Sequence, residues 1–170
     1  MTKTVNKKIR DEVLTEVAGE EAIRIIDFIK DKKETSEFTI AEKTKIEIHK
    51  TRTILYKLFE ANVATFIRRK DKIKGWYICY WDFAPQNINY AYKKLKKDRL
   101  EKLEVRLEKE LGQQFFMCKN ACARMNFEKA MDFEFKCPEC GELMQQQDNS
   151  RTIEFLTNSI NSLKKDLAEN

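Results

Sequence analysis

Four cysteines in two close pairs constrain the fold of this chain more than any other feature. Cys118 and Cys122 are separated by three residues, and after 14 further residues Cys137 and Cys140 are separated by two. Zn²⁺ prefers four ligands in a tetrahedron, and two tight turns with two thiolates each supply them. We therefore expect one structural Zn²⁺, bound by these four cysteines in a zinc ribbon, with no coordination position left for water.

The spacing alone also fits two disulfides or four free thiols. The first residues, Met1 to Lys8, lack the apolar segment of a secretory signal, so we expect a cytoplasmic protein whose thiols stay reduced. No apolar run approaches the ~20 residues needed to span a bilayer, which argues against a membrane protein. Both expectations favour the metal site. The fifth cysteine, Cys79, stands alone in an apolar stretch and is expected in a core.

The composition favours helices. Charged residues make up 36% of the 170 residues, with only 4 glycines and 2 prolines, while 42% hydrophobic residues suffice for a packed core. Apolar residues recur at helical spacing along the first third of the chain. Helices are expected at Asn6–Leu14 and on to Gly19, around Ile23–Ile29, after a cap at Thr35 or Ser36, and at Ile48–Asn62, where Thr51, Leu55, Leu58 and Phe59 would be buried.

The pattern then changes from helical to strand-like. Val63–Ile67 and Trp76–Phe83 are rich in β-branched and aromatic residues, and a charged turn, Arg68–Gly75, joins them. Helices followed by a hairpin, with a basic last helix, have the order of a winged helix-turn-helix module. Alternate residues of a strand share a face, so only one of the two alternating sets in Trp76–Phe83 can face the core.

Two further amphipathic helices are expected. Ile88–Leu111 reads as one helix of ~24 residues, or ~36 Å, with a narrow apolar stripe that ends at Leu111. After the cysteines, a last helix has apolar residues that step by 3, 4, 3 and 4 from Ile153 to Leu167. This heptad seam must be buried on the long helix, on a second copy of the chain or on another protein.

Together these segments predict a mostly α protein with small β sheets. Its expected parts are a winged helix domain over 1–86, a helical arm over 87–112, a four-cysteine zinc ribbon over 113–148 and an amphipathic C-terminal helix over 149–170. There is no glycine-rich phosphate loop, and His49 is the only histidine. With a closed metal site, no catalytic constellation remains, and we expect a binding protein rather than an enzyme.

The charged turn is the strongest candidate for contact with nucleic acid. Between residues 68 and 74, five Lys or Arg accompany one Asp, and aromatic residues follow at once. Cations attract phosphates, and aromatic faces stack on unpaired bases. The alternative is a solvated turn whose aromatic residues lie in the core. The candidate contact residues are Arg68, Arg69, Lys70, Lys72, Lys74, Trp76 and Tyr77.

The helix at Ile48–Asn62 is a weaker candidate. Its expected exposed face holds His49, Arg52 and a few lysines, and it lacks the dense Arg, Asn and Gln set that reads base edges. We therefore expect weak and sequence-independent contact with DNA.

The chain resembles the archaeal transcription factor E family, which corresponds to the N-terminal part of the eukaryotic TFIIE alpha subunit. The resemblance covers nearly the whole chain, with a winged helix, a helical arm and a zinc ribbon in this order. The family commonly has two residues between its first two cysteines, and Gly in the turn where this chain has Lys45. The most similar segments are Val17–Glu21, Ile54–Glu60, Lys74–Tyr77, Phe127–Met131 and Phe135–Gly141.

This resemblance implies a general transcription initiation factor. Such a factor joins RNA polymerase, the TATA-box-binding protein and transcription factor B at a promoter, assists DNA melting and stabilises the open complex. Its winged helix contacts the polymerase clamp, its wing lies near the non-template strand, and its ribbon lies by the clamp and stalk subunits. It would be a monomer or a heterodimer with a beta-type subunit, associated with the nucleoid. On this chain the wing corresponds to Arg68–Tyr77, and the metal ligands to Cys118, Cys122, Cys137 and Cys140.

A second function fits the same fold. A sequence-specific regulator could dimerise through Ile153–Leu167 and bind a palindromic duplex tightly, with a fixed half-site spacing. An initiation factor would instead bind duplex DNA weakly and associate with polymerase. A gel shift beside a polymerase pull-down separates the two.

Overall fold

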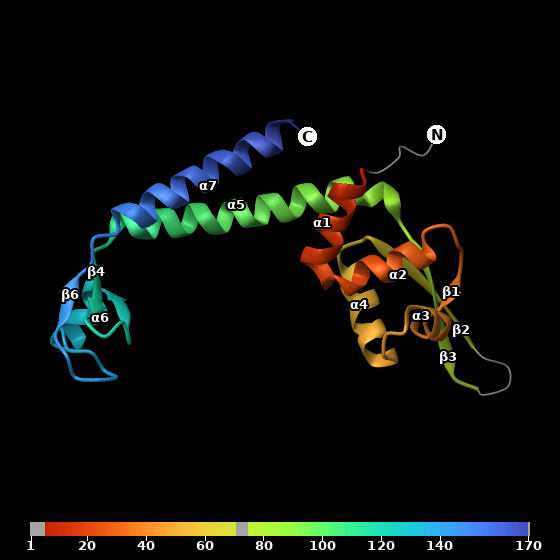
Figure 1. Cartoon of the computed structure of the whole chain (residues 1–170), viewed down its shortest axis with the longest axis horizontal. Helices are drawn as coiled ribbons and strands as arrows, with labels where there is room; N and C mark the ends of the chain where they lie inside the picture. Colours follow the sequence, from red (N-terminus) through yellow and green to blue (C-terminus); the bar gives the residue numbers. More distant parts are fainter. Residues whose placement is uncertain (1–5, 71–74, 170) are drawn as a thin grey trace. The chain divides into compact units, whose positions relative to one another are not determined.

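The structure is a computed structural model that describes residues 6–70 and 75–169. The chain divides into two compact units, Met1–Leu95 and Lys96–Asn170 (Figure 1). The finer division into four parts stays a prediction. Within the described ranges, no helix is long and apolar enough to cross a membrane.

The helices of the first unit begin and end at residues that the sequence marks. Gly19 ends the first helix with a φ of 88°, and the Ser36 side chain caps the third by accepting a hydrogen bond from the Thr39 amide. Lys45 ends the third helix in the left-handed conformation, φ 55°, which a glycine adopts more easily. The helices are α1 (Lys7–Ala18), α2 (Glu21–Ile29), α3 (Glu37–Thr44) and α4 (Ile48–Glu60).

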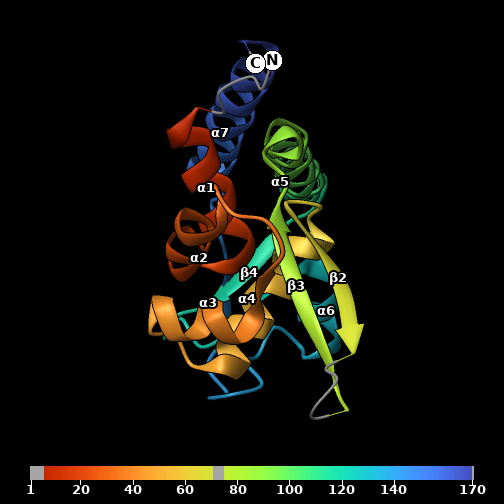
Figure 2. The ribbon, with the colours of Figure 1, turned by 90° about the vertical axis from the view of Figure 1, so that its right-hand side faces the viewer.

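A three-stranded antiparallel sheet in the order β1-β3-β2 lies beside α2, α3 and α4 (Figure 2). The prediction ended the first hairpin strand at Ile67 and was too short. β2 continues because Arg68 and Lys70 pair with Cys79 and Tyr77, and an edge strand tolerates charged side chains in solvent. β1 was not predicted, because two residues show no alternation. The strands are β1 (Thr35–Ser36), β2 (Ala64–Lys70) and β3 (Tyr77–Phe83).

An apolar core closes this unit. Of the two alternating sets in β3, the one with Cys79 and Trp81 faces the core, and Trp81 is fully buried. Phe59, predicted to be buried, is 42% exposed; it lies one residue before the end of α4 and contacts the Phe66 ring at a centroid distance of 4.9 Å. After a 3-10 turn, η1 (Pro85–Asn87), the start of α5 (Ile88–Gly112) adds Ile88 to the core. The other residues with no exposure include Val13, Leu14, Ile25, Ile26, Ile29, Ile40, Leu55, Leu58 and Val63.

In the second unit, the part of α5 from Lys96 onward pairs with the last helix, α7 (Ser150–Glu169) (Figure 1). Leu156, Ile160 and Leu163 of α7 are buried, and Lys164 forms an ion pair of 2.8 Å with Glu104 of α5. Of the three partners that the sequence left open, the long helix therefore covers the heptad seam.

The seam on α5 ends differently from the prediction. Leu111, the expected last residue, is 64% exposed, whereas Glu110 is only 4% exposed. Either residue continues a heptad pattern from Leu107, since steps of three and of four both occur. Glu110 takes the buried position because Arg124 of the ribbon and Asn149, the residue before α7, donate hydrogen bonds to its carboxylate.

The ribbon is a small antiparallel sheet in the order β5-β4-β6 with a short helix that was not predicted, α6. Its buried cluster consists of Cys118, Cys137 and Met144, and Phe116 packs against it. The resulting core is far smaller than that of the first unit. The elements are β4 (Phe115–Cys118), β5 (Arg124–Asn126), α6 (Phe127–Asp132) and β6 (Met144–Gln146).

Candidate metal centre and nucleic-acid interface

The ribbon brings the four predicted metal ligands together. One Sγ atom from each of Cys118, Cys122, Cys137 and Cys140 lies within 4.8 Å of the other three. Cys118 and Cys137 are buried, while Cys122 and Cys140 are exposed. All four are free thiols, so the disulfide alternative is not the arrangement that the chain adopts.

The spacing of the sulfur atoms fits a tetrahedral thiolate site. Around a metal with bonds of about 2.3 Å to sulfur, neighbouring sulfur atoms lie roughly 3.8 Å apart, whereas a disulfide joins them at about 2.05 Å. The Sγ atoms of Cys118 and Cys140 are 3.4 Å apart, and no pair in the cluster exceeds 4.8 Å. A donor set of four soft sulfur atoms suits Zn²⁺. The cluster is therefore compatible with one metal ion.

The two cysteine turns have different lengths, yet each brings its two cysteine sulfurs close to the other pair. In the first, Ala121 adopts the left-handed conformation, φ 57°, and its amide donates to the Cys118 carbonyl at 2.8 Å. The Asn120 amide points at the Cys118 Sγ, 3.3 Å away, where it offsets negative charge on the sulfur. In the second, Gly141 has φ 75°. The third residue between the first two cysteines is thus absorbed by a left-handed alanine.

The thiols of the cluster differ in acidity. Hydrogen bonding from the Glu142 amide, with help from Cys118, lowers the pKa of Cys140 to about 7. Hydrogen bonding with Cys140 raises the pKa of Cys122 to about 12, and burial raises the pKa of Cys137. A thiolate at Cys140 is thus favoured near neutral pH, while Cys122 and Cys137 keep their protons. A divalent cation must release those protons to bind all four sulfurs, so its affinity falls in acid.

A buried carboxylate ties the ribbon to the helices of its own unit. Arg124 of β5 donates to the Glu110 carboxylate at 2.8 Å and to the Gln147 side chain at 2.5 Å. The Asn149 side chain donates to the Glu110 carbonyl at 2.8 Å and to its carboxylate at 2.9 Å. Burial favours a higher pKa for Glu110, but the hydrogen bonds from Arg124 and Asn149 outweigh it and lower the pKa. Sequence reasoning missed this network, since Glu110 resembles the other glutamates of the arm.

The β2–β3 hairpin holds the candidate nucleic-acid residues that lie in the described ranges. Arg68, Arg69, Lys70, Trp76 and Tyr77 are all exposed, and Lys70 lies opposite Tyr77. The Arg68 guanidinium lies 5.7 Å from the centre of the Tyr77 ring, so cation and aromatic face occur together. Arg69 forms an ion pair of 2.6 Å with Glu34. Two further candidates, Lys72 and Lys74, fall outside the described residues.

Helix α4 offers less to a phosphate backbone. Lys50 forms an ion pair with Glu21 at 2.6 Å, and Arg52 forms one with the buried Glu37 at 2.7 Å. The hydrogen bond to Glu37 raises the pKa of Arg52, so the guanidinium stays charged and bound to the Glu37 carboxylate. Two cations of this helix are thus paired with carboxylates, and weak DNA contact by the helix stays a prediction.

Known proteins resemble this chain over nearly all its length. Residues 8–112 match the TFIIE alpha subunit family. Transcription factor E of Methanocaldococcus jannaschii is 35% identical over 168 residues, 98% of this chain and 97% of that protein. Transcription factor E of Thermococcus kodakarensis is 33% identical over 168 residues, 98% of this chain and 90% of that protein. A solved "Possible transcriptional regulator from Methanosarcina mazei Go1" covers 60% of this chain and 85% of its own, with 12% identity and a TM-score of 0.46, too low to define the fold.

Proposed function

Because this chain belongs to the TFIIE alpha family of transcription factors, which are not enzymes, we propose that it is a general initiation factor of an archaeal RNA polymerase. It joins polymerase, the TATA-box-binding protein and transcription factor B at the promoter, promotes melting and stabilises the open complex. The near full-length similarity to transcription factor E carries this proposal. The protein would act in the cytoplasm, at the nucleoid, as a monomer or a heterodimer with a beta-type subunit.

In this proposal, the β2–β3 hairpin contacts the non-template strand, and the winged helix and ribbon rest on the clamp and stalk of polymerase. The pairing of Arg68 with the exposed Tyr77 supports contact with an unpaired strand, since a cation attracts phosphate and a ring stacks on a base. Both interactions tolerate any sequence. The contact is therefore weak and depends on melted DNA.

The ribbon would bind one structural Zn²⁺ through Cys118, Cys122, Cys137 and Cys140. The bound ion would fix the ribbon and leave no position for a reacting water, because four protein ligands complete its coordination. The free thiols within 4.8 Å of one another support this assignment. The metal content of purified protein, measured as moles per chain, tests it.

The dimeric regulator is less well supported. Its dimerisation seam, Ile153–Leu167, packs on α5, where Leu156 is fully buried. Tight, sequence-specific binding to a palindromic duplex would nevertheless favour it over the initiation factor.

Open-complex lifetime tests the proposed function. Reversing the charges of Arg68, Arg69 and Lys70 to Glu should shorten the lifetime on a promoter while near-UV circular dichroism stays unchanged. A matched control reverses three exposed lysines on other elements, Lys7, Lys8 and Lys43, and should leave the lifetime unaltered. An equal effect of both triple variants, or no effect of the first, would remove the hairpin from the mechanism.

A further inference from the structure

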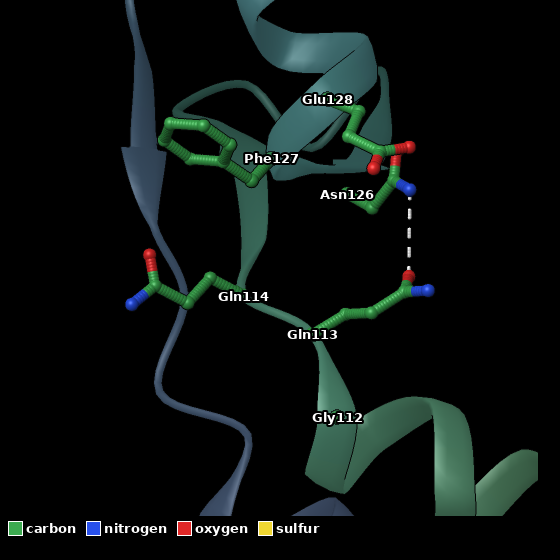
Figure 3. A pocket seen from close by; sticks show the side chains of 6 residues that line it. All are labelled: Gly112, Gln113, Gln114, Asn126, Phe127 and Glu128. Carbon is green, nitrogen blue, oxygen red and sulfur yellow. Dashed lines mark hydrogen bonds between the residues drawn. The ribbon is translucent and has the colours of Figure 1, made fainter.

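A depression lies where α5 passes into the ribbon (Figure 3). Its volume is about 320 Å³. Phe127 and Gln114 lie on one side of it, and Glu128, Asn126 and Gln113 lie on the other. The site thus combines one aromatic ring, three amides and one carboxylate. It contains none of the metal ligands and none of the candidate nucleic-acid residues.

The aromatic side chain of the depression, Phe127, packs against two other rings of the ribbon. The Phe127 ring lies 6.1 Å from Phe116 and 5.8 Å from Phe135, yet 44% of the residue stays exposed. Met131, one helical turn further along α6, is exposed as well and extends the apolar surface. A ring that packs on neighbouring rings and stays partly exposed suits contact with an alkyl chain or a cation.

The polar side of the depression carries a carboxylate that can pair with a cation. The Asn126 side chain donates to the Gln113 side chain at 3.4 Å and accepts from the Lys129 amide at 3.3 Å, so internal bonds orient both amides. Glu128 is exposed, and among the described residues no cation lies within ion-pair distance of its carboxylate. A carboxylate beside an aromatic ring is the complement of a Lys or Arg side chain.

The charge of the ribbon disfavours one class of partner. Residues 113–148 contain six Asp or Glu and four Lys or Arg, and a divalent metal on four thiolates would add further negative charge. Such a surface repels DNA and RNA and attracts a basic protein segment. The two charge patterns of the molecule thus point to two kinds of partner.

We propose that this depression binds a Lys or Arg side chain of an extended protein segment. The alkyl stem lies against Phe127, the charged group pairs with Glu128, and the side chains of Gln113 and Gln114 bind the backbone of the segment. This inference goes beyond the proposed function. It rests on the residues of the depression and on the charge of the ribbon, and it holds whether or not the hairpin contacts DNA.

Titration by nuclear magnetic resonance tests the proposal on the full-length, zinc-loaded chain. The probe is the blocked tripeptide Gly-Arg-Gly, and its comparison peptides replace Arg with citrulline or with Glu. We expect saturable shifts of the amides at residues 112–114 and 126–128 with the Arg peptide, and no saturation with either comparison peptide. Glu128→Gln should weaken binding about fivefold, the upper range for an exposed ion pair, and Glu128→Lys should weaken it further.

Glu142→Gln is the matched control, since Glu142 is another exposed ribbon glutamate without an ion pair among the described residues. The spectra of the unliganded variants show whether each is folded. Equal affinities for Glu128→Gln and Glu142→Gln overturn the proposal. So does an absence of saturable shifts with the Arg peptide, or stronger binding of a short single-stranded oligonucleotide at the same amides.

Discussion

The two units of this protein are stabilised internally by different means. The first closes around an apolar core that includes a fully buried tryptophan, while the buried cluster of the ribbon contains two of its cysteines and one methionine. Small modules that cannot bury enough apolar surface need a metal or another crosslink to fold. The stability of the first unit should therefore be independent of metal, and that of the ribbon should depend on it.

The two units also differ in their balance of charged residues. Residues 1–95 contain 20 Lys or Arg and 14 Asp or Glu, whereas residues 96–170 contain 13 and 14. The excess of cations lies in the unit with the hairpin, and the ribbon is acidic. The two proposed binding surfaces thus fall on units of different charge, the anion-binding one on the more basic unit and the cation-binding one on the more acidic unit.

Loss of one proposed cysteine ligand should have the largest effect on stability, and this effect should be confined to the ribbon. Cys137→Ser removes a buried thiol that we propose as a ligand, so the protein should lose a large part of the roughly 10–16 kcal/mol that structural Zn²⁺ contributes to such sites. Zinc content should fall well below one per chain, and amides of 113–148 should exchange rapidly with deuterium. Cys79→Ala, which alters a thiol of the first unit, should keep full zinc content. Retained zinc in Cys137→Ser would contradict the ligand assignment.

A cavity in the core of the first unit should destabilise that unit and leave the ribbon unchanged. Leu55→Ala removes a fully buried side chain and should cost about 2–5 kcal/mol of the unfolding free energy of the first unit. Thermal unfolding followed by tryptophan fluorescence measures it, because both tryptophans, Trp76 and Trp81, lie in this unit. Zinc affinity should not change. A parallel loss of zinc would mean that the units fold together.

Removing the buried charge of Glu110 should loosen the ribbon from its helices. Glu110→Gln weakens charge-assisted hydrogen bonds with Arg124 and Asn149 and should cost about 2 kcal/mol. Deuterium exchange at the start of α7 and in β5 should rise, while zinc content stays at one per chain. Glu108→Gln, at an exposed position of the same helix, serves as the control.

The same carboxylate sets a pH dependence. Its pKa is lowered in the folded protein, so its contribution is fully present above the unfolded pKa and is lost as the pH falls through the folded pKa. The stability difference between wild type and Glu110→Gln should therefore shrink in acid. A difference that grows with falling pH would contradict the assigned direction.

The left-handed alanine should give the smallest effect. Ala121→Gly relieves a conformation that costs an L-residue about 1–2 kcal/mol, partly offset by the greater freedom of glycine when unfolded, so a net gain of about 0.5–1 kcal/mol is expected. Competition with a zinc chelator measures the gain as tighter metal retention. Gly141→Ala should change retention in the opposite direction. A loss in both variants would show that the first turn is not strained.

The sequence was sufficient where local chemistry decides the structure. A helix cap at Thr35 or Ser36, the end of α1 at Gly19 and the gathering of the four cysteines were predicted from residue type and spacing, and the structure selects Ser36 as the cap. It was insufficient where a distant partner decides. The burial of Glu110 instead of Leu111 depends on Arg124 and Asn149, which lie far along the chain, and no local pattern indicates them.

The hairpin and the depression show the same limit for the candidate sites. The run of basic residues at 68–70 was readable, but the pairing of Arg68 with Tyr77 depends on strand register. The depression joins residues 112–114 to 126–128, which are brought together by the antiparallel pairing of β4 and β5, and the sequence does not specify the register of that pairing. The spacing of cysteines in the sequence indicates candidate metal ligands, whereas contacts between distant residues become visible only in the structure.

Metal removal, followed residue by residue, tests most directly whether the two units are held independently. A zinc chelator is titrated into the full-length protein, and amide spectra are recorded at each step with zinc content measured in parallel. We predict that signals of residues 113–148 collapse as zinc is lost, while those of the core around Leu55 and Trp81 keep their positions and intensities. Simultaneous collapse of both sets, or a ribbon that stays folded without metal, would contradict the account.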